Sequence, residues 1–255
     1  MREILLELQR RPDGYQVLVA PGLRRRLPEL LAPFNQSRPL FLVSDQRVAG
    51  LYGAGVQAEL QAGGYPSLLV TTPVGERAKT WAVVQRLAKA LLAHGAHRQS
   101  ALMALGGGVV GDVTGFLSSL FMRGTPFIQM PTSLLAMVDA SIGGKTAINL
   151  PEGKNLLGTF HQPRLVLIDP EFLGTLPASE RLNGLAETVK AGFIRAPELL
   201  QRLDTLGAAV FSQTDELTDV IHRAAAIKAG VVAADEREGD LRRILNFGHT
   251  LGHGL

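Results

Sequence analysis

Short β-prone runs recur along the first two thirds of the chain, with helical stretches between several of them. They are Leu40–Val43, Leu68–Thr71, Ala101–Leu105, Phe127–Met130 and Leu165–Ile168. This alternation is typical of an α/β protein whose mainly parallel sheet is covered by helices on both faces. Two further runs, Glu3–Gln9 and Tyr15–Val19, flank a Pro-Asp-Gly turn and predict a hairpin near the N-terminus.

The helical period is clearest after Thr80, where one apolar face precedes Gly95. That face consists of Trp81, Val84, Leu87, Ala88, Leu91 and Leu92. Beyond Pro177 the strand signal disappears, and helices are predicted over Glu180–Ile194, Pro197–Leu206, Glu216–Ala233 and Leu241–Leu255. We therefore expect two domains, an α/β domain over 1–177 and a mostly α-helical domain over 178–255.

Composition narrows the possible partners. A chain of 255 residues with 46% hydrophobic content can bury a sizeable core. The net charge is only +3 and the basic residues are scattered, so nucleic acid is not an expected partner. Because cysteine is absent, a transition metal would need histidine and carboxylate ligands. The N-terminus lacks the apolar core of a signal peptide and no apolar stretch suits a membrane, so we expect a cytoplasmic protein.

A glycine-rich turn follows the run at Ala101–Leu105. Its pattern, Gly106-x-Gly108-x-x-Gly111, matches the dinucleotide fingerprint between a strand and a helix. The acidic ribose partner usually found about 20 residues later is missing. Asp45, after an earlier strand, could take that role. The turn by itself leaves a dinucleotide and other phosphate ligands equally open.

Charged residues on glycine-marked loops indicate an anionic ligand. Of the 26 basic residues only six are lysines, and two of them, Lys145 and Lys154, follow glycines close to Asp139. Loop lysines are most often simply solvated, but two so close together favour an anion site. Arg123, beside Gly124, is either similar or a cation at a helix C-terminus.

Two further patterns lie in the predicted helical part. Glu187 and Lys190 have the i,i+3 spacing that most often indicates a surface ion pair. His249 and His253 have the i,i+4 spacing of a two-histidine metal site. Arg242, Asn246 and the two histidines would form one polar stripe on a helix, which an ordinary surface helix rarely carries.

Taken together, these motifs resemble the 3-dehydroquinate synthase family of sugar-phosphate cyclases over nearly the whole chain. The strings that carry the resemblance are Pro73–Glu76 with Lys79, Gly106–Asp112, Phe127–Thr132, Val138–Ala147, Gly153–Gly158, Ile168–Pro170, Thr175–Pro177, Gly184–Lys190, Val231–Glu238 and Asn246–His253. The resemblance implies a Rossmann-like N-terminal domain that binds NAD. It also implies a helical C-terminal domain that carries zinc (or cobalt), an active site between the two, and a homodimer.

The resemblance also assigns roles to individual residues. It places the cofactor against Asp45, Glu76, Lys79, Gly107, Gly108, Val109, Asp112, Thr132, Ser133, Leu135, Lys145, Lys154, Phe172, Thr175, Leu176 and Glu180. It gives the metal Glu187 and His249. It places around the substrate Asp139, Lys145, Lys154, Asn155, Lys190, Lys228, Arg242, Asn246 and His253. It also implies that Arg123 contributes to the phosphate pocket of the neighbouring subunit.

The implied reaction belongs to the shikimate pathway, which leads to chorismate and the aromatic amino acids. It converts 3-deoxy-arabino-heptulosonate 7-phosphate into 3-dehydroquinate and phosphate. The steps are transient oxidation by NAD, phosphate elimination, re-reduction and aldol closure. In this scheme we expect His253 to move protons, because its reference pKa is near ~6.5.

Departures from the family pattern keep other functions open. Ser133 stands where the family often has threonine, Ala140 where serine is common, and Arg47 where a smaller polar residue can help to hold adenosine. The family also continues into helices with a third zinc ligand, in a His-Gly-Glu string, and a further lysine, so we expect this chain to be truncated. The alternatives are another NAD-dependent sugar-phosphate cyclase, a polyol dehydrogenase, or a non-catalytic NAD-binding fragment.

Overall fold

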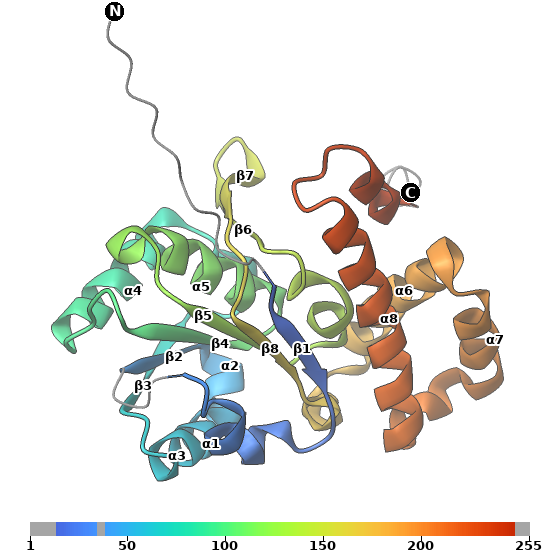
Figure 1. Cartoon of the computed structure of the whole chain (residues 1–255), viewed down its shortest axis with the longest axis horizontal. Coiled ribbons are helices and arrows are strands. Elements are labelled where there is room, and N and C mark those ends of the chain that lie inside the picture. The colour runs from blue at the N-terminus through green and yellow to red at the C-terminus, as the bar shows by residue number, and fades with distance from the viewer. Residues whose placement is uncertain (1–13, 35–38, 248–255) are drawn as a thin grey trace, which may run out of the picture.

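The computed structural model describes residues 14–34 and 39–247, and its centre is a six-stranded sheet (Figure 1). The strand order is β1-β8-β5-β4-β2-β3, and every pairing in it is parallel. The strands are β1 (Gln16–Val19), β2 (Leu40–Asp45), β3 (Ser67–Thr72), β4 (Ala101–Gly106), β5 (Phe127–Pro131) and β8 (Leu165–Ile168). The α/β class and the five strands expected from the recurring runs are confirmed.

Helices cover both faces of this sheet, which is why its central strands β2, β4 and β5 are buried along their whole length without alternation. The helices of this part are α1 (Leu27–Leu30), α2 (Gln46–Val48), α3 (Ala54–Ala62), α4 (Trp81–Ala93) and α5 (Gly108–Leu120). Phe41 and Val43 pack with α4 and α5 on one face, whereas Leu40 and Leu42 face the cluster that contains α1 and α3. The side chains of successive β2 residues thus pack into two separate hydrophobic cores, one on each face of the sheet.

The amphipathic helix after Thr80 forms as expected, with the Thr80 hydroxyl accepting the Val83 N–H at 3.3 Å as its N-cap. Its buried face is narrower than the sequence suggested. Val84, Leu87 and Leu91 are buried, but Trp81 and Leu92 are each 53% exposed.

A second, two-stranded antiparallel sheet was not anticipated. It joins β6 (Lys145–Leu150) to β7 (Gly153–Phe160) and projects from the body as a hairpin (Figure 1). We had expected Lys145 and Lys154 on loops, and that was wrong. Their glycines indicated turns, but the chain turns only at residues 151–152, between the two strands.

The helical part lies beside β1 (Figure 1). It consists of α6 (Ala178–Arg195), α7 (Pro197–Leu206), α8 (Thr214–Ala234) and two 3-10 segments, η7 (Gly207–Ser212) and η8 (Leu241–Asn246). Val220 and Ile221 of α8 belong to the same apolar cluster as Val166 and Ile168 of the sheet. The three α-helices match the expectation. The α-helix expected from Leu241 is instead a 3-10 segment that ends at Asn246.

Two expectations fall partly outside the described residues. Glu3–Gln9, the first strand of the predicted hairpin, lies outside the described residues. The second strand of that hairpin corresponds to β1, which pairs in parallel with β8. His249 and His253 also lie outside. None of the described helices is both long and apolar enough to cross a bilayer. The division at 177/178 remains a prediction.

Candidate active site

The site begins at the glycine turn between β4 and α5. A Cβ at Gly106 would lie 2.6 Å from a methyl of Val110, and one at Gly111 would lie 2.8 Å from the Gln129 side chain. Glycine at these positions therefore lets α5 pack tightly against the sheet. The 13-residue helix α5 starts beside the strand edge with its first N–H groups and positive dipole end toward the turn.

The residues predicted to hold a cofactor gather around this turn. Asp45 ends β2 and Thr132 follows β5. Because β2 and β5 are the two neighbours of β4, both residues lie with the glycine turn at the carboxyl edge of the sheet. The Thr132 N–H donates to the Gly106 carbonyl at 3.0 Å. Cβ atoms added at Gly107 and Gly108 would lie 3.4 Å from Ser133 Oγ and 3.1 Å from Ala140 Cβ. This glycine cradle fits the pyrophosphate of a dinucleotide, which needs close approach of backbone.

A tyrosine supports the other side of the predicted cofactor site. The Tyr52 hydroxyl lies 2.7 Å from Thr175 Oγ1, and its ring meets that of Phe172 edge-on at 4.7 Å. Leu135 and Leu176 are half-buried, and Glu180 is exposed in the first turn of α6. Nothing in the sequence singled out Tyr52, because it lies in an apolar helix that carries no motif.

Lys79, Asp112 and Asn155 form one cluster, in which Lys79 is buried, Asp112 is half-buried and Asn155 is exposed. The Lys79 ammonium is bonded to Asp112 Oδ2 at 2.6 Å and to Asn155 Oδ1, although the lysine is only 3% exposed. Burial raises the pKa of Asp112 to about 6, against the opposing effect of the Lys79 charge. The adjacent Glu76 accepts a 2.8 Å hydrogen bond from the Asn149 amide. A titratable carboxyl is therefore held at the base of the β6–β7 hairpin.

A second ion pair joins the helical segment η5 (Ala136–Ala140), which follows β5, to α8. The Lys228 ammonium donates to Asp139 Oδ1 at 2.5 Å. Burial opposes ionisation of Asp139, but Lys228, with Lys190 and Arg242 nearby, lowers its pKa overall. Burial also lowers the pKa of Lys228 despite the Asp139 charge. On α6, Lys190 pairs with Glu187 as the spacing predicted, but both side chains are largely buried rather than on the surface.

Arg242 holds a turn rather than facing an open cavity. It is 1% exposed, and its guanidinium donates to the Gly143 carbonyl at 3.1 Å and to the Glu236 carbonyl at 2.5 Å. The Gly143 N–H donates to the Tyr15 hydroxyl at 3.0 Å. Gly143 and Gly144 both have positive φ, 103° and 65°, which favours glycine. This turn fixes the backbone between Asp139 and Lys145.

Beyond the turn, Lys145 contacts an acid that we had not predicted. Its ammonium pairs with Glu238 Oε2 at 2.5 Å, and this contact lowers the pKa of Glu238, with further help from Asn246. Both residues line a cavity of about 510 Å³ together with Asp112 and Asn155. Glu238 closes the string Val231–Glu238, so its position in that motif was the one signal that could have found it.

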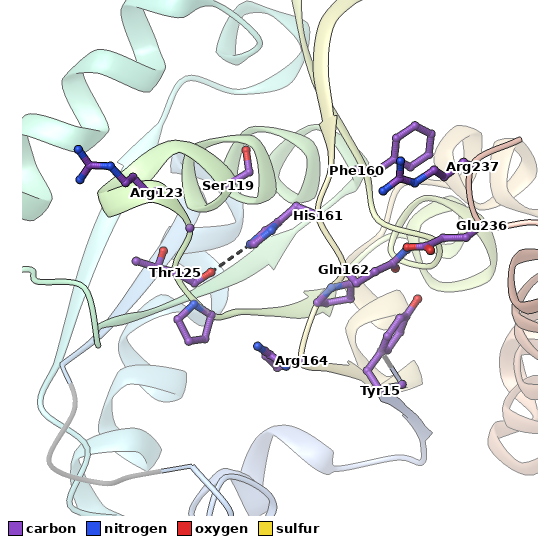
Figure 2. A pocket seen from close by; sticks show the side chains of 14 residues that line it. Tyr15, Ser119, Arg123, Thr125, Phe160, His161, Gln162, Arg164, Glu236 and Arg237 are labelled. Atoms are coloured by element: carbon purple, nitrogen blue, oxygen red, sulfur yellow. Dashed lines mark hydrogen bonds between the residues drawn. The ribbon is translucent and has the colours of Figure 1, made fainter. Parts of the chain in front are cut away.

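Two predicted residues stay apart from these clusters. Lys154 is exposed and makes no ion pair with the residues that the structure describes. Arg123 lines another cavity of about 510 Å³, where it points away from Tyr15 and Gln162 (Figure 2). There His161 Nε2 contacts the Thr125 carbonyl at 3.0 Å and Gln162 donates to Glu236 at 2.9 Å. Among residues 14–34 and 39–247, no three histidine, aspartate or glutamate side chains gather as a metal site.

Solved structures define the class of protein to which this fold and site belong. The 2-epi-5-epi-valiolone synthase ValA from Streptomyces hygroscopicus subsp. jinggangensis 5008, with NAD+ and Zn2+ bound, is 35% identical, with a TM-score of 0.86 over 96% of this chain and 68% of that one. A 2-deoxy-scyllo-inosose synthase is 27% identical, with a TM-score of 0.83 over 94% and 66%. Glycerol dehydrogenase from Schizosaccharomyces pombe, at 15% identity and a TM-score of 0.66, shares the fold alone. The class is that of the sugar-phosphate cyclases.

Sequence relatives give the family. The models for the N-terminal and C-terminal parts of 3-dehydroquinate synthase match residues 69–183 and 184–255. The 3-dehydroquinate synthase of Gloeobacter violaceus is 48% identical over 95% of this chain and 67% of the relative. That of Thermodesulfovibrio yellowstonii is 43% identical over 100% and 71%. The chain belongs to the 3-dehydroquinate synthase family, and it spans about two thirds of the length of these relatives.

Proposed function

We propose that the protein is a 3-dehydroquinate synthase and therefore a carbon–oxygen lyase. It would convert 3-deoxy-arabino-heptulosonate 7-phosphate into 3-dehydroquinate and phosphate. The observation that carries the proposal is the juxtaposition of a glycine cradle with two partly buried lysine–carboxyl pairs, Lys79–Asp112 and Lys228–Asp139. A reaction that moves both protons and a phosphate needs titratable groups and cations beside the redox cofactor.

The cofactor proposed for this site is NAD. Gly107 and Gly108 would lie against its pyrophosphate, and Asp45 would accept a ribose hydroxyl. Bound NAD would supply the acceptor for a hydride of the substrate, and that hydride is returned to the substrate later in the reaction. For zinc, or cobalt, we propose Glu187 and His249 as ligands, and the metal would polarise a substrate oxygen. Of these two, the described residues include only Glu187, which lies on α6.

The chain's own residues would bind the substrate and handle its protons. Lys145, on the rim of the cavity with Asn155, would exchange its partner Glu238 for an anionic group of the substrate. Asp112, whose pKa of about 6 lies near neutrality, could hold or release a proton in the same cavity. Asp139 and Lys228 would keep a fixed charge pair behind the site. Arg242 would act through the Gly143–Gly144 turn that it holds.

The remaining assignments extend the same proposal. His253 and Asn246 would complete the substrate side, with His253 moving protons. Lys154 and Lys190 would add positive charge, and Arg123 would reach the site of a second copy in a homodimer. We further propose that the protein works in the cytoplasm, in aromatic amino acid biosynthesis.

The test is a product assay on the purified chain with NAD+, Zn2+ and 3-deoxy-arabino-heptulosonate 7-phosphate. We expect phosphate release matched by 3-dehydroquinate, with no net NADH. Lys145→Met should abolish turnover, whereas the exposed Lys89→Met should not. Turnover only with a different seven-carbon sugar phosphate would point to another cyclase, and net NADH from a polyol would point to a dehydrogenase. Dinucleotide binding without any turnover would favour the non-catalytic fragment.

A further inference from the structure

Asp45 and Arg47 stand at the carboxyl end of β2, next to the glycine turn. β2 pairs in parallel with β4, with Ser44 opposite Leu105, so Asp45 lies level with Gly106. In doubly wound α/β sheets, this edge is where a dinucleotide lies with its ribose near an acidic residue. Both side chains therefore belong to the adenosine end of the proposed site.

The carboxylate of Asp45 is locked in place. It is 9% exposed, and its Oδ1 accepts the backbone N–H groups of Arg47 at 2.8 Å and Val48 at 3.0 Å. Across the described ranges its Oδ2 takes part in no hydrogen bond or ion pair. Two backbone donors thus partly compensate its charge, and one oxygen remains to accept a hydroxyl.

Arg47 carries an uncommitted positive charge at the same place. Its side chain is exposed, and within residues 14–34 and 39–247 its guanidinium has no carboxylate partner, unlike that of Arg25, which is bidentate to Glu171. The backbone N–H of Arg47 donates to the Asp45 carboxylate, so the Arg47 side chain begins directly beside that carboxylate. A guanidinium is well matched to the oxygens of a phosphate.

We infer that the adenosine end of this site accepts a dinucleotide with a 2′-phosphate as well as one with a free 2′-hydroxyl. Arg47 would pair with the phosphate, and Asp45 would accept the hydroxyl. The inference rests on the proposed dinucleotide site. Rossmann-like domains commonly use an acid for the hydroxyl or an arginine for the phosphate, and this chain has both within three residues. Since Asp45 repels a phosphate, the hydroxyl form stays the tighter ligand.

Equilibrium binding tests this without any catalytic turnover. Calorimetric titration of the purified chain with NAD+ and with NADP+ should give dissociation constants within roughly tenfold of each other. Arg47→Asn should weaken NADP+ by about tenfold or more and NAD+ by less than about threefold, since one charge-assisted contact is lost. Arg98→Asn is the matched control, because Arg98 is exposed and precedes β4, at the opposite edge of the sheet. It should change neither constant.

The outcomes separate this inference from the function on which it rests. NAD+ binding with NADP+ weaker by more than about tenfold would overturn the inference alone. An Arg47→Asn chain that loses both ligands equally, or neither, would do the same. A wild-type chain that binds neither dinucleotide would contradict the proposed function as well.

Discussion

The buried Lys79–Asp112 pair offers a quantitative test of the electrostatics at the base of the β6–β7 hairpin. Replacing Lys79 by methionine keeps most of the volume of the side chain but removes the ammonium that lies 2.6 Å from Asp112 Oδ2. Asp112 then has no cation beside it in a site where burial already raises its pKa to about 6. We expect the pKa of Asp112 to rise further in this variant.

The sign and size of the effect follow from linkage. A carboxyl whose pKa is raised by folding costs nothing below its unfolded pKa of about 3.9 and destabilises the native state progressively as the pH rises to its folded pKa. The wild-type chain therefore loses about 3 kcal/mol from this group between pH 3.9 and about 6. In the variant the pKa of Asp112 lies higher, so the loss continues above pH 6, by about 1.4 kcal/mol for each pH unit until that higher pKa is reached.

Urea unfolding at pH 5 and pH 8 measures this difference. The extra instability of Lys79→Met should be small at pH 5 and should grow to at least about 1 kcal/mol at pH 8. The double variant Lys79→Met/Asp112→Asn should lose the extra pH dependence, because the titrating group is gone. The exposed control Lys89→Met should behave like wild type. An equal loss at both pH values, or a double variant with unchanged pH dependence, would refute the reasoning.

Three further predictions concern the Gly143–Gly144 turn and the loop that faces it. Gly143→Ala should cost roughly 2 kcal/mol or more, because its Cβ would lie 2.3 Å from the buried guanidinium at a φ of 103°. Gly55→Ala, with nothing within 4 Å, should be neutral or stabilising on thermal unfolding. Tyr15→Phe should speed amide hydrogen exchange at Gly143, whereas Tyr52→Phe should not, and equal exchange in both would contradict the bond. Asp235→Ala should expose residues 236–240 to limited proteolysis, because the Asp235 carboxylate accepts three backbone N–H groups of this loop, and an uncleaved variant would refute this. These hydrogen bonds lower the pKa of Asp235 to about 2, so in wild type they should weaken only as the pH falls towards 2.

Some features were predictable because they are local. The strand Ala101–Gly106, the glycine turn after it and the helix Ala178–Arg195 follow from apolar runs and helical period, which neighbouring residues determine. The same holds for the Glu187–Lys190 pair, since the i,i+3 spacing brings these side chains together on any helix. The family motifs likewise directed attention to Asp45, Thr132 and Ser133, which lie with the glycine turn at the carboxyl edge of the sheet.

Tertiary structure decided what those residues touch. The local patterns of Gly143 and Arg242 give no hint that, 99 positions apart, they would be joined by a hydrogen bond, nor that the guanidinium would be buried. The partners of Lys79, Asp112 and Asn155, come from α5 and β7, which packing alone brings together. The sequence by itself determined the α/β class, the glycine turn and the residue types of the site. Which charges are paired, buried or left open, as at Arg47, depends on long-range packing and on the solvent it excludes, because those set each group's desolvation and its neighbours.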